Sequence, residues 1–225
     1  MLPPVTLPRR LAAEALGSAL LLAAVVGSGI MGERLAGGNA AVALLANSIA
    51  TGATLAALIL VLGPVSGAHF NPLVTVASAV GRRTSWRDVP PYVAAQFVGA
   101  FFGVATAHGM FGEPVFSASR HVRQGPGQLL GEGVATLGLL AVVAGTPSRR
   151  PTAAAVGIAA YITAAYWFSS STAFANPAVT LARCATDTFA GIRPVDVPLF
   201  IVAQAVGAAA AIPLFRWLLP EELPG

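Results

Sequence analysis

The stretch FANPAVT, residues 174–180, occurs a second time with small changes as HFNPLVT, residues 69–75. In both copies an Asn-Pro pair is followed by an apolar residue, Val and Thr. Asn is a favoured helix N-cap, and Pro is favoured at the first helical position because its missing N–H would have no partner there. Asn71-Pro72 and Asn176-Pro177 therefore each predict the start of a helix. One such start lies in each half of the chain, which indicates a repeated unit.

The composition is that of a polytopic membrane protein. The chain has 225 residues, of which 56% are hydrophobic and 10% are charged, and its mean hydropathy is +0.74. Soluble domains contain about 25% charged residues. All 13 basic residues are arginines, scattered singly or in pairs, a pattern that does not suggest a nucleic-acid partner. A single cysteine, Cys184, excludes an intrachain disulfide and a multi-cysteine metal site, and no cofactor site is indicated.

Six apolar segments are each close to the roughly 20 residues that a membrane-spanning helix needs. They cover about 11–31, 40–62, 89–111, 127–146, 151–168 and 196–219. Two shorter apolar stretches, about 66–80 and 173–183, carry the Asn-Pro pairs. Ten residues of helix rise about 15 Å, half of a hydrocarbon core of about 30 Å. We therefore expect an all-α membrane protein with six transmembrane helices and two re-entrant half-helices, which must be buried in protein or line a water-filled path.

The repeat extends beyond the asparagines. In each half, a helix with a glutamate precedes a second helix, the Asn-Pro half-helix and a helix that carries AQ-x-VGA. The matching residues are Glu14 with Glu132 and Gln96 with Gln204. The expected repeats are residues 1–112 and 113–225. Because three spans per repeat is an odd number, the second copy starts on the opposite side of the membrane. The two half-helices should then enter from opposite faces, with their N-termini meeting near the midplane.

The arginines predict the orientation in the membrane. If the N-terminus is inside, the inner segments hold Arg9, Arg10, Arg82, Arg83, Arg87, Arg149, Arg150 and Arg216. The outer segments then hold Arg34, Arg120, Arg123, Arg183 and Arg193. Because arginine-rich loops tend to stay in the cytoplasm, this distribution favours cytoplasmic termini. We expect a multi-pass protein of the inner (plasma) membrane with both termini in the cytoplasm.

The sequences SGAHFNPLVTV, residues 66–76, and FANPAVTLAR, residues 174–183, resemble the motifs of the major intrinsic protein family of aquaporins and aquaglyceroporins. The six spans, with Glu in the first and fourth, extend the resemblance over nearly the whole chain. The region SSSTAFANPAVTLARCATDTFAGI, residues 169–192, looks most like the bacterial branch associated with arsenic-resistance operons. The resemblance implies a homotetramer with one pore per subunit.

The asparagines are the expected centre of the pore. Side-chain N–H groups of Asn71 and Asn176 would be offered to a passing solute oxygen, and the two helix N-termini would add positive potential that opposes cations and proton relay. The alternative is that both residues only cap helices. The first motif departs from the family pattern because Leu73 replaces the expected Ala, whereas Ala178 keeps it. Leu73 should loosen or shift the contact between the half-helices, or be a tolerated packing change.

The second departure from the family pattern is a residue of the expected constriction, the narrowest part of the pore. The residue after the second Asn-Pro-Ala is usually Arg, and here it is Val179. Family spacing adds three further positions to the constriction, namely Thr51, Ala164 and Ala173, and Ala165 could replace Ala164. These side chains would form a wide, uncharged, weakly polar ring. Arg183, one helical turn beyond Val179, either lines the outer mouth and repels cations or bonds loop carbonyls.

The glutamates, one histidine and the cysteine each allow two interpretations, one structural and one functional. Glu14 and Glu132 could relay protons. The family resemblance instead implies that they accept hydrogen bonds from the half-helix loops. His69 is expected to be structural or to face the inner vestibule. Cys184 is expected to be packed, with trivalent arsenic or mercury binding as the alternative.

The sequence therefore predicts a passive channel rather than an enzyme, because no catalytic cluster, metal-ligand spacing or phosphate-binding loop is present. The expected solutes are small and neutral: glycerol-like polyols, metalloid acids such as arsenite or methylated arsenicals, and water. A plain water and glycerol channel is one alternative, and a proton-coupled inverted-repeat transporter is another. A non-conducting membrane scaffold is a third. The expected partners are the lipid bilayer and other copies of the chain.

Overall fold

The computed structural model describes residues 5–146 and 150–219. All regular structure in these residues is helical. The helices are α1 (Leu7–Leu35), α2 (Ala40–Ser66), α3 (Pro72–Val80), α4 (Val89–Phe111), α5 (Pro126–Gly145), α6 (Pro151–Phe168), α7 (Pro177–Ala182), η1 (Arg183–Ala185), η2 (Pro194–Asp196) and α8 (Val197–Leu218). The expectation of an all-α protein is confirmed. Arg149, one of the arginines used to predict orientation, lies outside the described residues.

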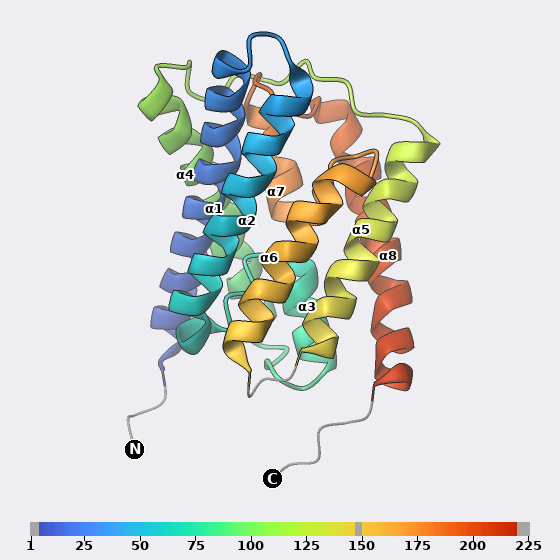
Figure 1. Ribbon diagram of the computed structural model, residues 1–225. Coiled ribbons are helices and arrows are strands. Elements are labelled where there is room, and N and C mark those ends of the chain that lie inside the picture. Colours follow the sequence, from blue (N-terminus) through green and yellow to red (C-terminus); the bar gives the residue numbers. More distant parts are fainter. Residues whose placement is uncertain (1–4, 147–149, 220–225) are drawn as a thin grey trace.

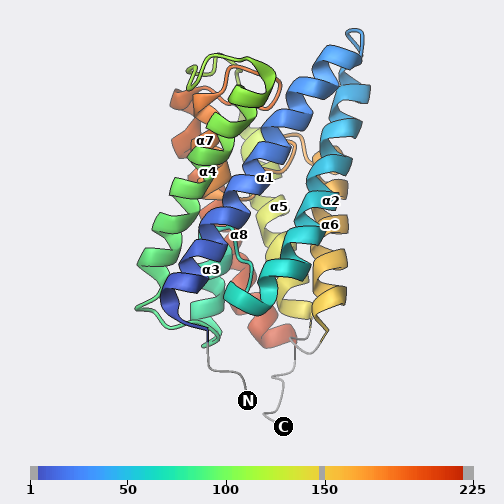
Figure 2. The ribbon, with the colours of Figure 1, turned by 90° about the vertical axis from the view of Figure 1, so that its left-hand side faces the viewer.

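Six helices are long and apolar enough to cross a membrane, and they correspond to the six predicted spans. They stand side by side in one bundle (Figure 1). The helix α1 begins, and α8 ends, at the same end of this bundle. The short helix α3 lies toward that end and α7 toward the other, in both views (Figures 1 and 2). We call these two ends the α3 end and the α7 end.

Glycines let the long helices cross closely. A Cβ added at Gly99 of α4 would lie 2.1 Å from the carbonyl oxygen of Ala15 in α1. In the second half, a Cβ at Gly207 of α8 would lie 2.3 Å from the carbonyl oxygen of Gly133 in α5. Small residues at such crossings allow backbones to approach, which is how membrane helices associate without a hydrophobic driving force between them. Both glycines belong to the repeated AQ-x-VGA sequence, so the two halves use the same device.

The helices surround a core that continues into the centre of the bundle. The residues around the two short helices are buried, including Ala79 of α3, Ala182 of α7 and Phe70 just before α3. The outward faces of the long helices carry exposed apolar side chains such as Val61 and Phe102. In a soluble protein such faces would be interaction sites or aggregation hazards. Here they suit contact with lipid.

Candidate functional site

The two Asn-Pro pairs come together at the centre of the bundle, and each asparagine bonds the opposite segment. Asn71 Nδ2 donates to the carbonyl oxygen of Ala175 at 2.8 Å, and Asn176 Nδ2 donates to the carbonyl oxygen of Phe70 at 2.8 Å. Each Oδ1 caps its own helix: Asn71 Oδ1 accepts from Leu73 N, and Asn176 Oδ1 from the first N–H groups of α7. The predicted N-caps are confirmed. An amide nitrogen has two hydrogens, so each Nδ2 keeps one that its inter-segment bond does not use.

The backbone before each asparagine has an unusual conformation. The residues one and three positions before Asn71, Phe70 and Ala68, have φ values of 48° and 50°. The corresponding residues before Asn176, Ala175 and Ala173, both have φ of 48°. Non-glycine residues adopt this left-handed region rarely, at a cost of order 1–3 kcal/mol each. Such conformations persist only where the surroundings hold them in place.

Glu14 of α1 holds the first of these segments. Its carboxylate accepts hydrogen bonds from the backbone N–H of His69 at 2.9 Å and of Phe70 at 2.8 Å. It also accepts from Ser66 Oγ at 2.6 Å and from Gln96 Nε2 at 2.8 Å. Glu14 is completely buried. The carboxylate thus supplies acceptors to two N–H groups that the left-handed turns leave without a helical partner.

Glu132 of α5 does the same for the second segment. Its carboxylate accepts from the N–H of Phe174 at 2.8 Å, from the N–H of Ala175 at 2.9 Å and from Gln204 Nε2 at 2.6 Å. Gln204 Nε2 also donates to Thr180 Oγ1, as Gln96 Nε2 does to Thr75 Oγ1 in the first half. The two networks match in their two backbone donors and their glutamine, and only Glu14 also accepts from a serine.

A cavity follows the centre of the bundle past both asparagines. Its wall combines the two Asn-Pro segments with side chains of α1, α2, α5 and α6. Its lining residues include Thr51, His69, Asn71, Val74, Tyr166, Phe174, Asn176, Val179 and Arg183. Most of the remaining lining residues are aliphatic. The cavity thus presents a mainly apolar wall with a few polar groups, as expected of a site for small polar molecules.

Three of the four positions expected at the constriction, Thr51, Ala173 and Val179, line this cavity. The fourth does not. Ala164 is exposed on the outer face of α6, and the alternative, Ala165, is buried but is not among the lining residues. The expectation for α6 was wrong in register.

The helix α6 instead turns Ile162 and Tyr166 toward the cavity. Tyr166 Oη donates a hydrogen bond to Thr51 Oγ1 at 3.2 Å, so two hydroxyl groups from different halves of the chain meet at the wall. One signal in the sequence points to Tyr166, because it is one of the few residues with a polar group in an otherwise apolar helix. The spacing carried over from the family pointed elsewhere.

Arg183 both lines the cavity and bonds a loop carbonyl. It is only 2% exposed, it lines the cavity, and its Nε donates to the carbonyl oxygen of Ala190. Its guanidinium carbon lies 3.4 Å from the centre of the Phe174 ring.

His69 also lines the cavity, and its Nδ1 lies 3.1 Å from Thr75 Oγ1. Cys184 is half-buried and does not line the cavity.

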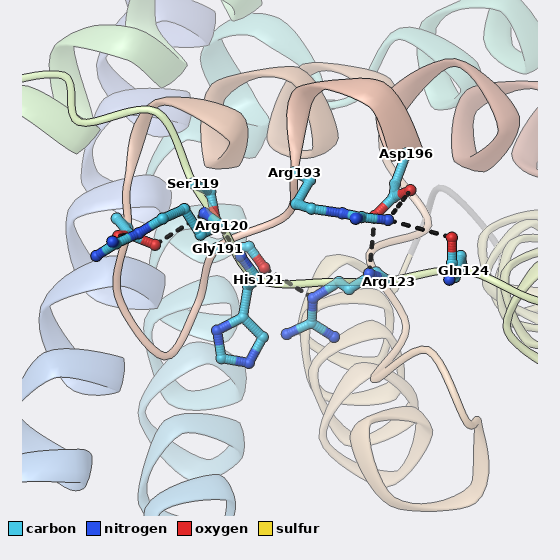
Figure 3. A network of polar contacts seen from close by, with 9 residues as sticks. Ser119, Arg120, His121, Arg123, Gln124, Gly191, Arg193 and Asp196 are labelled. Atoms are coloured by element: carbon cyan, nitrogen blue, oxygen red, sulfur yellow. Dashed lines mark hydrogen bonds and ion pairs between the residues drawn. The ribbon is translucent and has the colours of Figure 1, made fainter.

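Sequence reasoning missed Arg123. This residue lies in the connection between α4 and α5, and its Nε donates to the carbonyl oxygen of Gly191 at 2.8 Å (Figure 3). Its Nη1 reaches the carbonyl oxygen of Ser171 at 3.3 Å, and its Cζ lies 4.9 Å from the centre of the Phe174 ring. No local signal distinguishes Arg123 from Arg120 three residues earlier, because contacts with a distant segment define its role.

The same connection is bonded to the segment between α7 and α8 at several points (Figure 3). The N–H of Arg193 donates to the carbonyl oxygen of His121 at 2.9 Å. The N–H of Arg123 donates to Asp196 Oδ2 at 2.9 Å, and Arg193 forms an ion pair with the same carboxylate. This network fixes the backbone that presents Arg123 and Arg183 at the α7 end.

Comparison with known proteins identifies the family that has this architecture. Residues 2–155 match the sequence profile of the family described as Major intrinsic protein. The chain belongs to the major intrinsic protein family. It is 54% identical to the aquaglyceroporin AqpS of Rhizobium meliloti (strain 1021) over 220 residues, which cover 97% of this chain and 93% of AqpS. It is 30% identical to aquaporin NIP2-3 of Zea mays over 230 residues, covering 98% of this chain and 73% of that protein.

The fold also matches a solved structure of the same type. The X-ray structure of the aquaglyceroporin from Plasmodium falciparum aligns with a TM-score of 0.74 at 19% identity, covering 94% of this chain and 95% of that chain. At that identity the likeness shows the fold alone. Major intrinsic proteins are multi-pass membrane channels rather than enzymes, so the expectations of family, fold class and a non-enzymatic role are confirmed.

Proposed function

We propose that this major intrinsic protein is a passive channel for small neutral solutes: water, glycerol-like polyols and metalloid acids such as arsenite or methylated arsenicals. One observation carries the proposal. The cavity passes Asn71 and Asn176, each of which keeps an unused Nδ2 hydrogen, while the position that is usually Arg in the family is Val179. Donors aimed at a mainly apolar path suit uncharged solutes with acceptor oxygens. The relative AqpS is an aquaglyceroporin, which supports water and polyols as solutes.

The constriction we propose is formed by Thr51, Ala173, Val179 and Tyr166. Tyr166 takes the place of Ala164, whose side chain lies on the outer surface. With no guanidinium at position 179, this ring holds two hydroxyl groups and two aliphatic side chains, which favours solutes larger than water. The preference for metalloid acids rests on this width and on the 54% identity to a bacterial aquaglyceroporin.

A proton-coupled transporter is the competing proposal, and the environment of the buried glutamates argues against it. Glu14 accepts four hydrogen bonds and Glu132 three, and neither side chain lines the cavity. A carboxylate that relays protons needs contact with water or a carrier group along the path. These two carboxylates are instead saturated by the segments that they hold.

We further propose that the α3 end faces the cytoplasm, so that both termini are inside and the α7 end is outside. Of the described arginines, Arg9, Arg10, Arg82, Arg83, Arg87, Arg150 and Arg216 belong to the α3 end. We also propose that residues 1–112 and 113–225 are inverted repeats, supported by the matched glutamate networks.

We propose as well that the protein forms a homotetramer in the inner membrane. The outer surface between α2 and α6 is lined by small residues such as Gly52 and Ala160, which suits close helix contact.

Stopped-flow light scattering on proteoliposomes tests the function. Vesicles with the protein should shrink or swell faster than protein-free vesicles in water, glycerol and arsenite gradients. The rates should not change when a proton gradient is imposed at the same osmotic load. Glycerol entry that tracks the proton gradient would replace the channel by a transporter. Water flux with no arsenite flux would reduce the proposal to a plain water and glycerol channel.

A further inference from the structure

Two guanidinium groups meet at the α7 end of the cavity, and both lie against one aromatic ring. Arg183, which directly follows α7, has its Cζ 3.4 Å from the centre of the Phe174 ring. Arg123, from the connection between α4 and α5, has its Cζ 4.9 Å from the same centre. Phe174 is itself buried and lines the cavity. A ring face attracts a cation through its quadrupole, so Phe174 offsets part of the repulsion between the two charges.

The remaining hydrogen bonds of both guanidinium groups are to neutral oxygens. Arg183 Nε donates to the carbonyl of Ala190, and Arg123 donates to the carbonyls of Gly191 and Ser171. Within residues 5–146 and 150–219, no carboxylate forms an ion pair with either guanidinium. The buried Glu132 carboxylate attracts both guanidinium groups electrostatically, and its single charge can offset one of the two at most.

Both groups are charged in their surroundings. Burial lowers the pKa of the Arg123 guanidinium to about 10, which is still far above neutral pH. Arg183 has terminal N–H groups that bond no acceptor in the described part of the chain, and its side chain lines the cavity. These donors can therefore serve the oxygen of a passing solute or water molecule.

We propose that Arg123 and Arg183, held together on Phe174, are the cation-exclusion element of this channel, placed one helical turn beyond Val179. The inference rests on the proposed channel function. An arginine at position 179 would narrow the path and repel cations at the same point. Here the two tasks are separate. Thr51, Tyr166 and Val179 set the width, and the arginine pair sets the charge. A hydronium, sodium or ammonium ion meets two positive charges in a low-dielectric mouth, whereas a neutral polyol meets hydrogen-bond donors.

The experiment compares cation leak with glycerol flux in proteoliposomes of equal protein density. Proton and sodium leak is followed with trapped fluorescent dyes under an imposed potential, and glycerol flux by light scattering. Arg183→Gln should raise the leak about tenfold or more, because it removes the charge nearer the path. Arg123→Gln should raise the leak less, and its glycerol flux should stay within about twofold of the wild type. Arg183→Lys should keep the leak low, since it keeps the charge.

Arg120→Gln is the matched control. Arg120 lies on the same connection and carries the same charge, but its side chain is 90% exposed and pairs with Asp187. Its replacement should leave the leak unchanged. If Arg183→Gln does not assemble, Arg123→Gln and Arg183→Lys decide the question. A wild-type leak in Arg123→Gln with intact glycerol flux overturns the inference. Wild-type protein that passes no glycerol overturns the proposed function instead, whatever the leak shows.

Discussion

The segments around Asn71 and Asn176 have the same backbone and different chemistry. Each enters the centre through three residues with positive φ, begins a helix at an Asn-Pro pair, and is held by a buried glutamate and a glutamine. The residue two before the asparagine is His69 in one segment and Phe174 in the other. The residue seven after it is Ser78 in one and Arg183 in the other. The two ends of the cavity therefore differ in charge although their scaffolds match.

The comparison shows which positions serve the scaffold and which serve selection. Residues that hold the backbone are repeated, because both half-helices need the same hydrogen-bond partners. Some residues that line the cavity are not repeated, among them His69 and Arg183, and they give its two ends a different chemistry. The long connection between α4 and α5 crosses the α7 end and adds Arg123 there (Figure 3). The two segments therefore differ in side chains that take no part in holding the backbone.

The largest expected effect is on the scaffold, at the two glutamates. Glu14→Gln and Glu132→Gln each place an amide opposite buried N–H donors, which should lower the stability by about 3–5 kcal/mol, as for breaking a buried charged contact. Glu14→Gln should cost more, because Glu14 accepts four hydrogen bonds and Glu132 three. The measurement is the thermal unfolding midpoint in mild detergent.

The control for that pair is Glu33→Gln, an exposed glutamate on α1. It should unfold at the wild-type temperature. If Glu14→Gln and Glu132→Gln behaved like this control, the carboxylates would not hold the two segments, and the matched networks would not contribute to the stability of the fold.

The next effect concerns the two close helix crossings. Gly99→Ala and Gly207→Ala each put a Cβ within 2.1–2.3 Å of a carbonyl oxygen of the facing helix, so the helices must separate. We expect a loss of about 1–3 kcal/mol in each half. Gly109→Ala on α4, where a Cβ would meet nothing within 4 Å, is the matched control and should be neutral or stabilising. Unequal losses at Gly99 and Gly207 would show that the two halves are not equally packed.

The third expected effect is on the selection of solutes, at two matched positions of the repeats. Val179 and Val74 both lie three residues after an asparagine, and both line the cavity. Val179→Arg should narrow the constriction and lower the glycerol-to-water permeability ratio about tenfold, corresponding to about 1.4 kcal/mol of barrier. Val74→Arg should change this ratio less, because the proposed constriction lies on the Val179 side. Both ratios are measured by stopped-flow light scattering. An unchanged ratio in Val179→Arg would mean that position 179 does not form the constriction.

The smallest effect is expected at the departure from the motif. Leu73 is partly exposed, whereas the corresponding Ala178 is 1% exposed. Leu73→Ala should therefore change the stability by about 1 kcal/mol or less, below the range for a fully buried leucine. Ala178→Leu must fit three extra carbon atoms into a filled site and should cost about 1–3 kcal/mol. Equal costs in unfolding measurements would show that Leu73 fills a contact between the half-helices.

Much of the scaffold could be predicted from the sequence. The predicted spans at 40–62 and 89–111 correspond to α2 (Ala40–Ser66) and α4 (Val89–Phe111). Apolar runs of this length have few alternatives in a membrane, because every backbone group must find a partner within its own helix. The Asn-Pro pairs fixed the starts of α3 and α7 for a local reason, since capping involves only neighbouring residues.

Only the tertiary structure decided which side chains of α6 face the cavity and which arginines meet. Each residue turns a helix by about 100°, so an error of two positions moves a side chain from the cavity to the outer surface. For this reason Tyr166 lines the cavity, whereas Ala164 is exposed. Arg123 and Arg183 are distant in the sequence, and Phe174 joins them only after the α4–α5 connection has folded across the α7 end. The sequence by itself determined the helices and their caps, which depend on local bonding, and the fold decided the contacts between distant segments.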